Sequence, residues 1–179
     1  MGIFDLFLRF KKDPTRDWPA GTVSLPEIDQ SGMLSGPLKF GCNLQQARFF
    51  GKPDKFTWKS SENCELLYAR SGFQIEFECD KLDYVAFFIG PDEFLPDFPG
   101  LSFSQPVLKD KAVFNQKTTR EFVRQIFGTP VTEDVDADET IMAFSKSGII
   151  LEFEFNPTGY LKRWNLFPEI VPGQHLEKS

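Results

Sequence analysis

The chain has 179 residues, 41% of them hydrophobic and 21 of them phenylalanine, and its formal net charge is −6 at pH 7. The aromatic content excludes a largely disordered chain. The acidic balance argues against nucleic acid, which needs a basic footprint, and against an anionic membrane surface. This balance fits a soluble protein or one that meets a basic protein. The three cysteines are typical of buried thiols in a reducing compartment, so we expect a cytoplasmic protein.

Metal, disulfide and membrane signals are weak along the chain. The three cysteines, Cys42, Cys64 and Cys79, have neither the spacing of a disulfide framework nor that of a zinc site. The sequence holds no run of about 18 apolar residues that would span a membrane. We expect no metal, no cofactor and no stable membrane insertion.

Residues 1–40 are interpreted as an N-terminal extension. Its first residues place apolar side chains at the spacing of an amphipathic helix: Ile3, Phe4, Phe7 and Phe10. This helix could dock on the body of the protein or touch a lipid interface. We favour docking, because Arg9, Lys11 and Lys12 are few positive charges for a peripheral anchor.

Residues 41–90 predict a short helix followed by an antiparallel meander. Asn43 is a candidate N-cap, and Gly51 with Pro53 marks the helix end. "GFQIEFEC" then alternates apolar and polar residues, as a strand with one buried face does. "KFTWKS" is a possible extra strand. Residues 91–117 hold four prolines and indicate an irregular crossover that packs through its apolar residues, which are Phe94, Phe98, Leu101 and Phe103.

Residues 118–167 repeat the pattern of residues 41–90. Nine identities occur in register, three at an offset of 77 and six at an offset of 76. Thr118 and Glu121 have the spacing of a capping box, and "GIILEFEF" repeats the alternating strand. Because one such unit hides its apolar face poorly, two copies are expected to share a core. We predict an α+β fold of two tandem copies, with one shared curved sheet, helices on one face, and a tail at residues 168–179.

The order helix, "FGKP" or "FGTP", strand, turn and "EFEF" resembles the repeat of the beta-lactamase inhibitory protein family. It is also similar to the small lipoprotein of the outer-membrane barrel-assembly machinery. The resemblance covers about 100 residues, and it implies binding of another protein through a concave sheet face. Two departures from this resemblance are expected. We expect neither the signal peptide nor the lipidated cysteine of the lipoprotein relatives, and the cysteines lie only in the first copy, whereas the inhibitory protein is secreted and has disulfides. The target enzyme is therefore not carried over.

Two groups of residues are candidate partner-binding sites. The four strand glutamates Glu76, Glu78, Glu152 and Glu154 would form either an acidic docking surface or an ordinary solvated face. The third strands place Tyr84, Tyr160 and Trp164 on one parity with Lys162 between the last two. If these side chains face solvent, they form an aromatic patch that could bind a partner. If they face inward, they belong to the core. We favour the core, because the polar residues Arg163 and Asn165 lie on the opposite side of the same strand. Trp58 either anchors a partner or covers the core.

The expected function is a non-enzymatic protein-binding module of inhibitor or immunity type, either a monomer or a homodimer through sheet edges. No catalytic residue is assigned, because no histidine, nucleophile elbow or phosphate loop accompanies the glutamates. One alternative is a carrier of an apolar ligand or lipid, which a Phe-lined cavity above about 300 Å³ would favour. A small enzyme with a carboxylate pair is the other.

Overall fold

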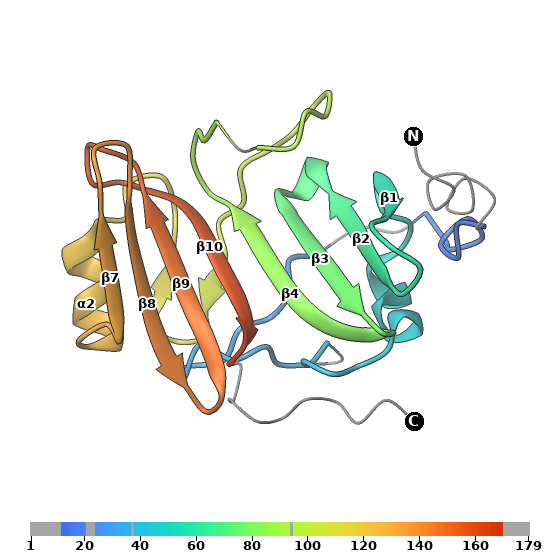
Figure 1. Ribbon diagram of the computed structural model, residues 1–179, viewed down its shortest axis with the longest axis horizontal. Coiled ribbons are helices and arrows are strands. Elements are labelled where there is room, and N and C mark those ends of the chain that lie inside the picture. Colours follow the sequence, from blue (N-terminus) through green and yellow to red (C-terminus); the bar gives the residue numbers. More distant parts are fainter. Residues whose placement is uncertain (1–11, 21–23, 37, 94, 170–179) are drawn as a thin grey trace.

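The computed structural model describes residues 12–20, 24–36, 38–93 and 95–169. Within these ranges, eight strands form one antiparallel sheet in the order β1-β2-β3-β4-β10-β9-β8-β7 (Figure 1). The strands are β1 (Lys55–Trp58), β2 (Asn63–Tyr68), β3 (Phe73–Glu78), β4 (Lys81–Phe88), β7 (Thr132–Val135), β8 (Thr140–Lys146), β9 (Ile149–Phe155) and β10 (Leu161–Pro168). A separate hairpin consists of β5 (Val107–Leu108) and β6 (Ala112–Val113).

The predicted α+β fold of two tandem helix-plus-sheet copies is wrong, because the described chain is mostly sheet. Its helical parts are one 3₁₀ helix, η1 (Leu44–Phe50), a 3₁₀ turn, η2 (Ala69–Ser71), and one α-helix, α2 (Arg120–Phe127). The two halves of the chain meet where β4 pairs with β10, so one ladder of backbone hydrogen bonds crosses the whole molecule. This continuous ladder, and not a pair of helix-backed units, defines the architecture.

Side-chain caps fix the N-terminal ends of η1 and α2. Asn43 accepts a hydrogen bond from the backbone N–H of Gln46, whose side chain in turn accepts from the Asn43 N–H, so this N-cap prediction is confirmed. The predicted cap at Thr118 is wrong by one residue. Thr119 is the N-cap of α2, because its hydroxyl accepts from the Phe122 N–H, whereas the Thr118 hydroxyl accepts from Asn115.

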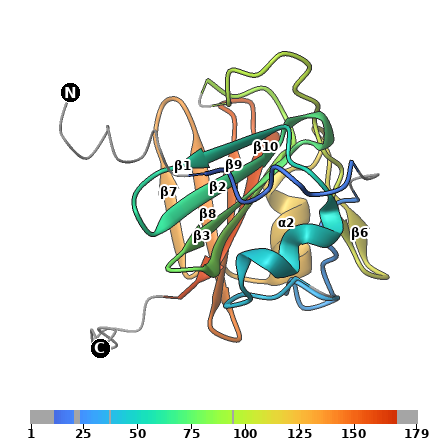
Figure 2. The ribbon, with the colours of Figure 1, turned by 90° about the vertical axis from the view of Figure 1, so that its right-hand side faces the viewer.

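The alternating strands bury one face, as the sequence pattern predicts. In β3 the side chains of Phe73, Ile75 and Phe77 are buried, and in β9 those of Leu151 and Phe153 are buried. η1 and α2 both lie on this side of the sheet (Figures 1 and 2). The main core therefore lies between the sheet and a layer of helices and loops. We call the other side of the sheet, away from η1 and α2, the open face.

The crossover covers one end of the open face. Phe98 and Leu101 pack against a small cluster formed by Leu67, Ala86 and Phe88, which confirms that this segment packs on the body. Phe103 is an exception, since it is 40% exposed. Phe94, the predicted helix of residues 3–10 and residues 170–179 lie outside the described residues. In the part of the chain that the structure describes, no helix has the length and apolar character needed to cross a bilayer.

Candidate binding surface on the open sheet face

A β-bulge in β10 brings two cations to the open face side by side. The register of β10 with β9 shifts between Leu161 and Arg163, so Lys162 is the extra residue. Leu161 and Trp164 remain buried on the core side. Lys162 and Arg163 instead both lie within 3.9 Å of Glu154 on the open face, although neighbouring strand residues normally point to opposite sides.

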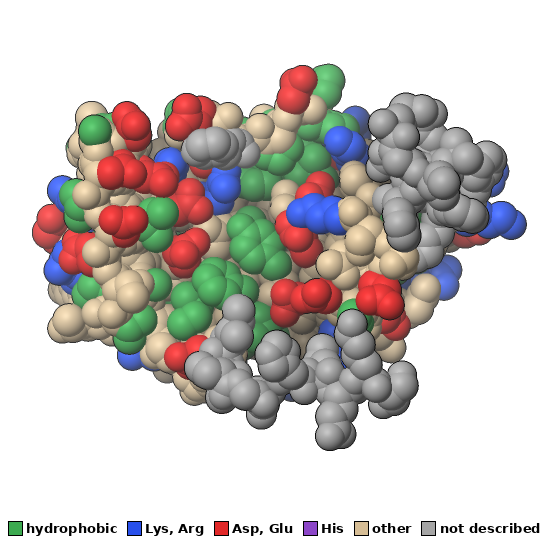
Figure 3. Space-filling model, in the orientation of Figure 1, with side chains coloured by type: hydrophobic (Ala, Val, Ile, Leu, Met, Phe, Trp, Pro, Cys, Tyr) green, Lys and Arg blue, Asp and Glu red, His purple; other side chains and the backbone are tan. Residues whose placement is uncertain are grey.

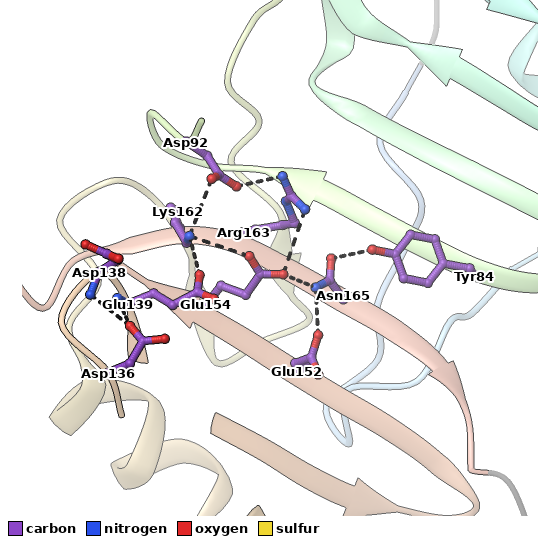
Figure 4. Close-up of polar contacts among 10 residues, drawn as sticks. All are labelled: Tyr84, Asp92, Asp136, Asp138, Glu139, Glu152, Glu154, Lys162, Arg163 and Asn165. Atoms are coloured by element: carbon purple, nitrogen blue, oxygen red, sulfur yellow. Dashed lines mark hydrogen bonds and ion pairs between the residues drawn. The ribbon is translucent and has the colours of Figure 1, made fainter. Parts of the chain in front are cut away.

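These two cations join the crossover to the sheet (Figure 4). An Arg163 guanidinium nitrogen lies 2.6 Å from the Asp92 carboxylate, whose side chain is only 1% exposed. The Lys162 Nζ atom lies 3.4 Å from the other Asp92 oxygen and 2.5 Å from Glu139, which precedes β8. Three separate chain segments are thus held at one point by ion pairs that are largely withdrawn from water.

Asn165 extends these contacts across the centre of the sheet. Its side-chain amide donates to Glu152 at 2.9 Å and to Glu154 at 2.5 Å. Its carbonyl oxygen accepts a hydrogen bond from the Tyr84 hydroxyl at 2.9 Å. Both amide hydrogens and the oxygen are therefore used, which satisfies a side chain that is only 2% exposed. We call the connected set the sheet-face network. It consists of Tyr84, Asp92, Glu139, Glu152, Glu154, Lys162, Arg163 and Asn165.

The protonation states in the network follow from burial and charge. Burial lowers the pKa of Lys162, but the hydrogen bond to Glu139 and the charges of Asp92, Glu139 and Glu154 outweigh it, so this pKa lies above its ordinary value. Burial raises the pKa of Tyr84, and its phenol stays a hydrogen-bond donor. Lys162 is held as an ammonium ion. It serves as a cross-link between carboxylates and not as a base.

Glu154 gives the network a pH-dependent contribution to stability. Burial, the largest cause, raises the pKa of its carboxyl above 4.5, against the opposing effects of Arg163, Asn165 and Lys162. The folded chain then holds this proton more tightly than the unfolded chain does. The stabilising contribution is complete below pH 4.5 and is lost as pH rises through the folded pKa.

We therefore expect the stability of the native chain, measured relative to Glu154→Gln, to fall as pH rises from 4.5. Urea unfolding of both proteins over a pH series measures this difference. Subtracting the variant cancels the titration of the other groups. A difference that stays constant or grows with pH would mean that the neighbouring cations outweigh burial.

An apolar patch lies beside the network on the open face. The ring of Tyr84 stacks on that of Phe167, with centroids 6.3 Å apart and planes at 24°. Ile150 is the cross-strand neighbour of Phe167, and all three side chains are partly exposed. Figure 3 shows hydrophobic side chains in the middle of this face with carboxylates around them. We call Tyr84, Ile150 and Phe167 the Tyr84 patch.

A second polar cluster lies on the other side of the Tyr84 patch. Lys59, just after β1, lies 2.6 Å from Glu76 on β3 and 3.1 Å from Glu65 on β2. Gln74 also donates to Glu76, at 2.7 Å. Counted together with the network, the two clusters hold six carboxylates (Glu65, Glu76, Asp92, Glu139, Glu152, Glu154) and three cations (Lys59, Lys162, Arg163). The patch is therefore bordered on both sides by net negative charge.

The predicted site residues do not all lie together. Glu76, Glu152, Glu154, Tyr84 and Lys162 are on the open face, but Glu154 and Lys162 are buried in ion pairs and are not free surface charges. Glu78 is exposed at the end of β3, opposite Lys81.

The aromatic candidates are divided between three places. Trp164 is fully buried on the core side, so it does not belong to an exposed surface. Because Lys162 is an extra residue in β10, Trp164 faces the core side of the sheet, whereas Tyr84 faces the open side. Tyr160 is 44% exposed and precedes β10. Trp58 lies on the edge strand β1 and packs edge-on against Phe56.

The sequence patterns did not identify Asp92, Glu139 and Phe167 as parts of this surface. Arg163 and Asn165 were used only to decide which side of their strand faces the core. Arg163 and Asn165 alternate with the buried Trp164 and Leu166, so a signal for them was present. Asp92 and Glu139 lie outside any periodic segment, and only the tertiary fold brings them to Lys162. Among the described residues, no group of three or more His, Cys, Asp or Glu side chains is arranged to hold a metal.

Comparison with known proteins adds little. No protein-family model matches the chain, and no curated protein matches it. Among solved structures, it is similar to a DUF4309 family protein, YjgB, from Bacillus subtilis, with 12% sequence identity and a TM-score of 0.49 over 78% of this chain and 90% of that chain. A likeness of this size says nothing about function. The resemblance to the beta-lactamase inhibitory protein stays a prediction.

Proposed function

We propose that this protein is a non-enzymatic binding module that docks another protein, of basic surface, on the open face of its sheet. The observation that carries the proposal is the Tyr84 patch with acidic clusters on both sides. Partly exposed aromatic and aliphatic side chains inside a polar rim are the anatomy of a protein-binding hot spot. An inhibitor or an immunity-type protein would act by binding its target through this surface.

The surrounding structure supports a rigid surface. The Tyr84 hydroxyl is fixed by Asn165, and Asn165 is fixed by Glu152 and Glu154. A side chain that is already ordered loses little conformational entropy when it meets a partner. The net negative rim would speed the approach of a basic partner. The association rate is then expected to fall as salt is added.

The two alternatives are less well supported. In the core, Trp164 has ring centroids within 6.4 Å of those of Phe87, Phe114, Phe127 and Phe153, so this Phe-rich region is filled by its own side chains. That favours a binding module over a carrier of an apolar ligand. The carboxylates on the sheet face are engaged by Lys59, Lys162, Arg163 and Asn165, which disfavours a carboxylate-pair enzyme.

Self-association through the sheet edge is also disfavoured. The edge strand β7 carries Glu133 and Asp134, and antiparallel pairing with a second copy would bring these charges together. Of the two predicted states, a monomer and a homodimer through a sheet edge, the charges on β7 favour the monomer.

Capture from a lysate of the source cell tests the proposal. The native chain and a Tyr84→Ala/Phe167→Ala variant are used as bait, and bound proteins are quantified by mass spectrometry. Losing both rings is expected to cost about 2 kcal/mol or more of binding free energy, or roughly 30-fold in affinity. We therefore expect one basic protein to be retained by the native chain and lost by the variant.

The matched control is Phe49→Ala. Phe49 is 47% exposed on η1, on the other side of the sheet. It should retain the partner as the native chain does. Equal retention by all three baits would place the docking surface elsewhere, and retention of no protein by the native bait would contradict the binding-module proposal. Circular dichroism melting of each bait excludes unfolding as the cause of a loss.

A further inference from the structure

A second β-bulge lies in β4, the strand that pairs with β10 in the middle of the sheet (Figure 1). The register of β4 with β3 shifts at Asp83, which has no cross-strand partner on β3. Leu82 and Val85 are both buried in the core, although residues three apart on a regular strand point to opposite sides. The extra residue therefore keeps both in the core and leaves Asp83 and Tyr84 side by side outside it.

Asp83 lies on the open face beside the Tyr84 patch. The charges that act on its carboxyl group are those of Glu76 and Glu78 on β3. These two side chains alternate with the buried residues of that strand and so point to the open face. Asp83 is partly exposed, and its chain neighbour Tyr84 supplies one ring of the patch. The bulge thus adds a carboxylate to the immediate border of the patch.

The Asp83 carboxylate is crowded by charges of its own sign. Burial, and after it the charges of Glu78 and Glu76, raises the pKa of this carboxyl group. Lys59 is already held by Glu65 and Glu76. In the part of the chain that the structure describes, no Lys or Arg side chain lies within ion-pair distance of Asp83.

The two bulges of the open face therefore differ in charge balance. In β10 the bulge places Lys162 and Arg163 against the buried carboxylate of Asp92. In β4 the bulge places a carboxylate among other carboxylates. A charge that is repelled in the free chain, and that lies beside exposed aromatic and aliphatic side chains, is suited to a cation supplied by another molecule.

We propose that Asp83 determines which partner the open face accepts, by pairing with a lysine or arginine side chain of that protein. This inference rests on the proposed function and adds the polar contact that accompanies the apolar one. A lysine or arginine has both parts that the position needs. Its apolar stem can lie over the Tyr84 ring, and its charged end can reach the carboxylate.

The stability of the free chain is the first test, because it needs no partner. Asp83→Asn keeps the size of the side chain and removes a repelled charge, so it is expected to melt at a higher temperature than the native chain at pH 7. Circular dichroism melting measures this difference. A melting temperature equal to or below that of the native chain would mean that the carboxylate already has a stabilising contact, and would overturn the proposal.

The matched control is Asp110→Asn, which changes the net charge by the same amount. Asp110 lies in the turn between β5 and β6, beside α2 and away from the open face. Its carboxylate accepts a hydrogen bond from Gln30 at 3.2 Å. Removing this charge relieves no repulsion from Glu76 or Glu78, so no gain in melting temperature is expected.

Binding is the second test, with the protein that the native chain retains from lysate as the probe. Asp83→Asn is expected to bind it about tenfold more weakly, mainly through faster dissociation, and Asp110→Asn as tightly as the native chain. Biolayer interferometry measures both rates. Because the two variants have the same net charge, the comparison separates a local ion pair from general attraction.

The outcomes distinguish this inference from the proposed function. Equal affinity of the native chain and Asp83→Asn, with binding still lost in Tyr84→Ala/Phe167→Ala, would overturn the role of Asp83 and leave the docking surface in place. If the native chain retains no protein at all, the proposed function is contradicted and the role of Asp83 fails with it.

Discussion

Trp164→Ala is expected to lower the free energy of unfolding by about 3–5 kcal/mol, the usual cost of removing a large buried aromatic side chain. Trp164 is fully buried, and its ring stacks on that of Phe153 with centroids 5.0 Å apart. It also contacts Phe114 at 4.8 Å. Few side chains near Trp164 could move into the cavity that alanine would leave, because the surrounding rings are held in place by their own packing. Urea unfolding followed by circular dichroism measures the loss.

Two matched variants separate this interpretation from a surface role. Tyr160 is 44% exposed, so Tyr160→Ala should change stability by about 0.5 kcal/mol or less. The Trp164 indole N–H has no hydrogen-bond partner among the described residues, so Trp164→Phe loses no hydrogen bond and should cost about half as much as Trp164→Ala or less. A Trp164→Ala chain as stable as the native chain would contradict the core assignment.

Arg163→Ala is expected to lower the free energy of unfolding by about 3 kcal/mol, because it leaves buried carboxylates with too few cations. The Asp92 side chain is 1% exposed and has Arg163 at 2.6 Å and Lys162 at 3.4 Å. Lys162 is already shared with Glu139 and Glu154. It cannot also replace the guanidinium. The loss should be seen in urea unfolding at neutral pH. It should shrink under acid conditions, because burial raises the pKa of Glu154 and its protonation removes one of the charges that Arg163 balances.

The double variant Arg163→Ala/Asp92→Asn provides the control. Asp92→Asn removes the negative charge that Arg163 balances in the native chain, so part of the lost stability should return. If Asp92→Asn lowers stability further in the Arg163→Ala background, the arginine stabilises the chain through its packing over Phe88, 6.0 Å away, and not through the ion pair.

Strand positions were the part of the fold most accessible from the sequence. "GFQIEFEC" and "GIILEFEF" correspond to β3 and β9 with the predicted faces buried, because side chains alternate across a pleated sheet. The fold class was wrong for a physical reason. Two short helix signals of seven or eight residues were taken as a main part of each copy, whereas the described chain is mostly one eight-stranded sheet.

The surface was less predictable than the strands. Period two assigns residues to faces only while the register is regular, and a single bulged residue reverses the parity that follows. In β10 that residue is Lys162, so Trp164 is core while Arg163 and Asn165 face outward. Ion pairs to Asp92 and Glu139 join segments far apart in the sequence. Local patterns carry no signal for such pairs.

Radical footprinting of the captured complex determines whether the open face is the docking surface. The oxidation rates of Tyr84 and Phe167 are measured in the free chain and in the chain bound to the protein retained from lysate. Phe49, exposed on the other side of the sheet, is the internal reference. We expect strong protection of Tyr84 and Phe167, with the oxidation rate of Phe49 unchanged. Protection of Phe49 with no change at Tyr84 and Phe167 would contradict it.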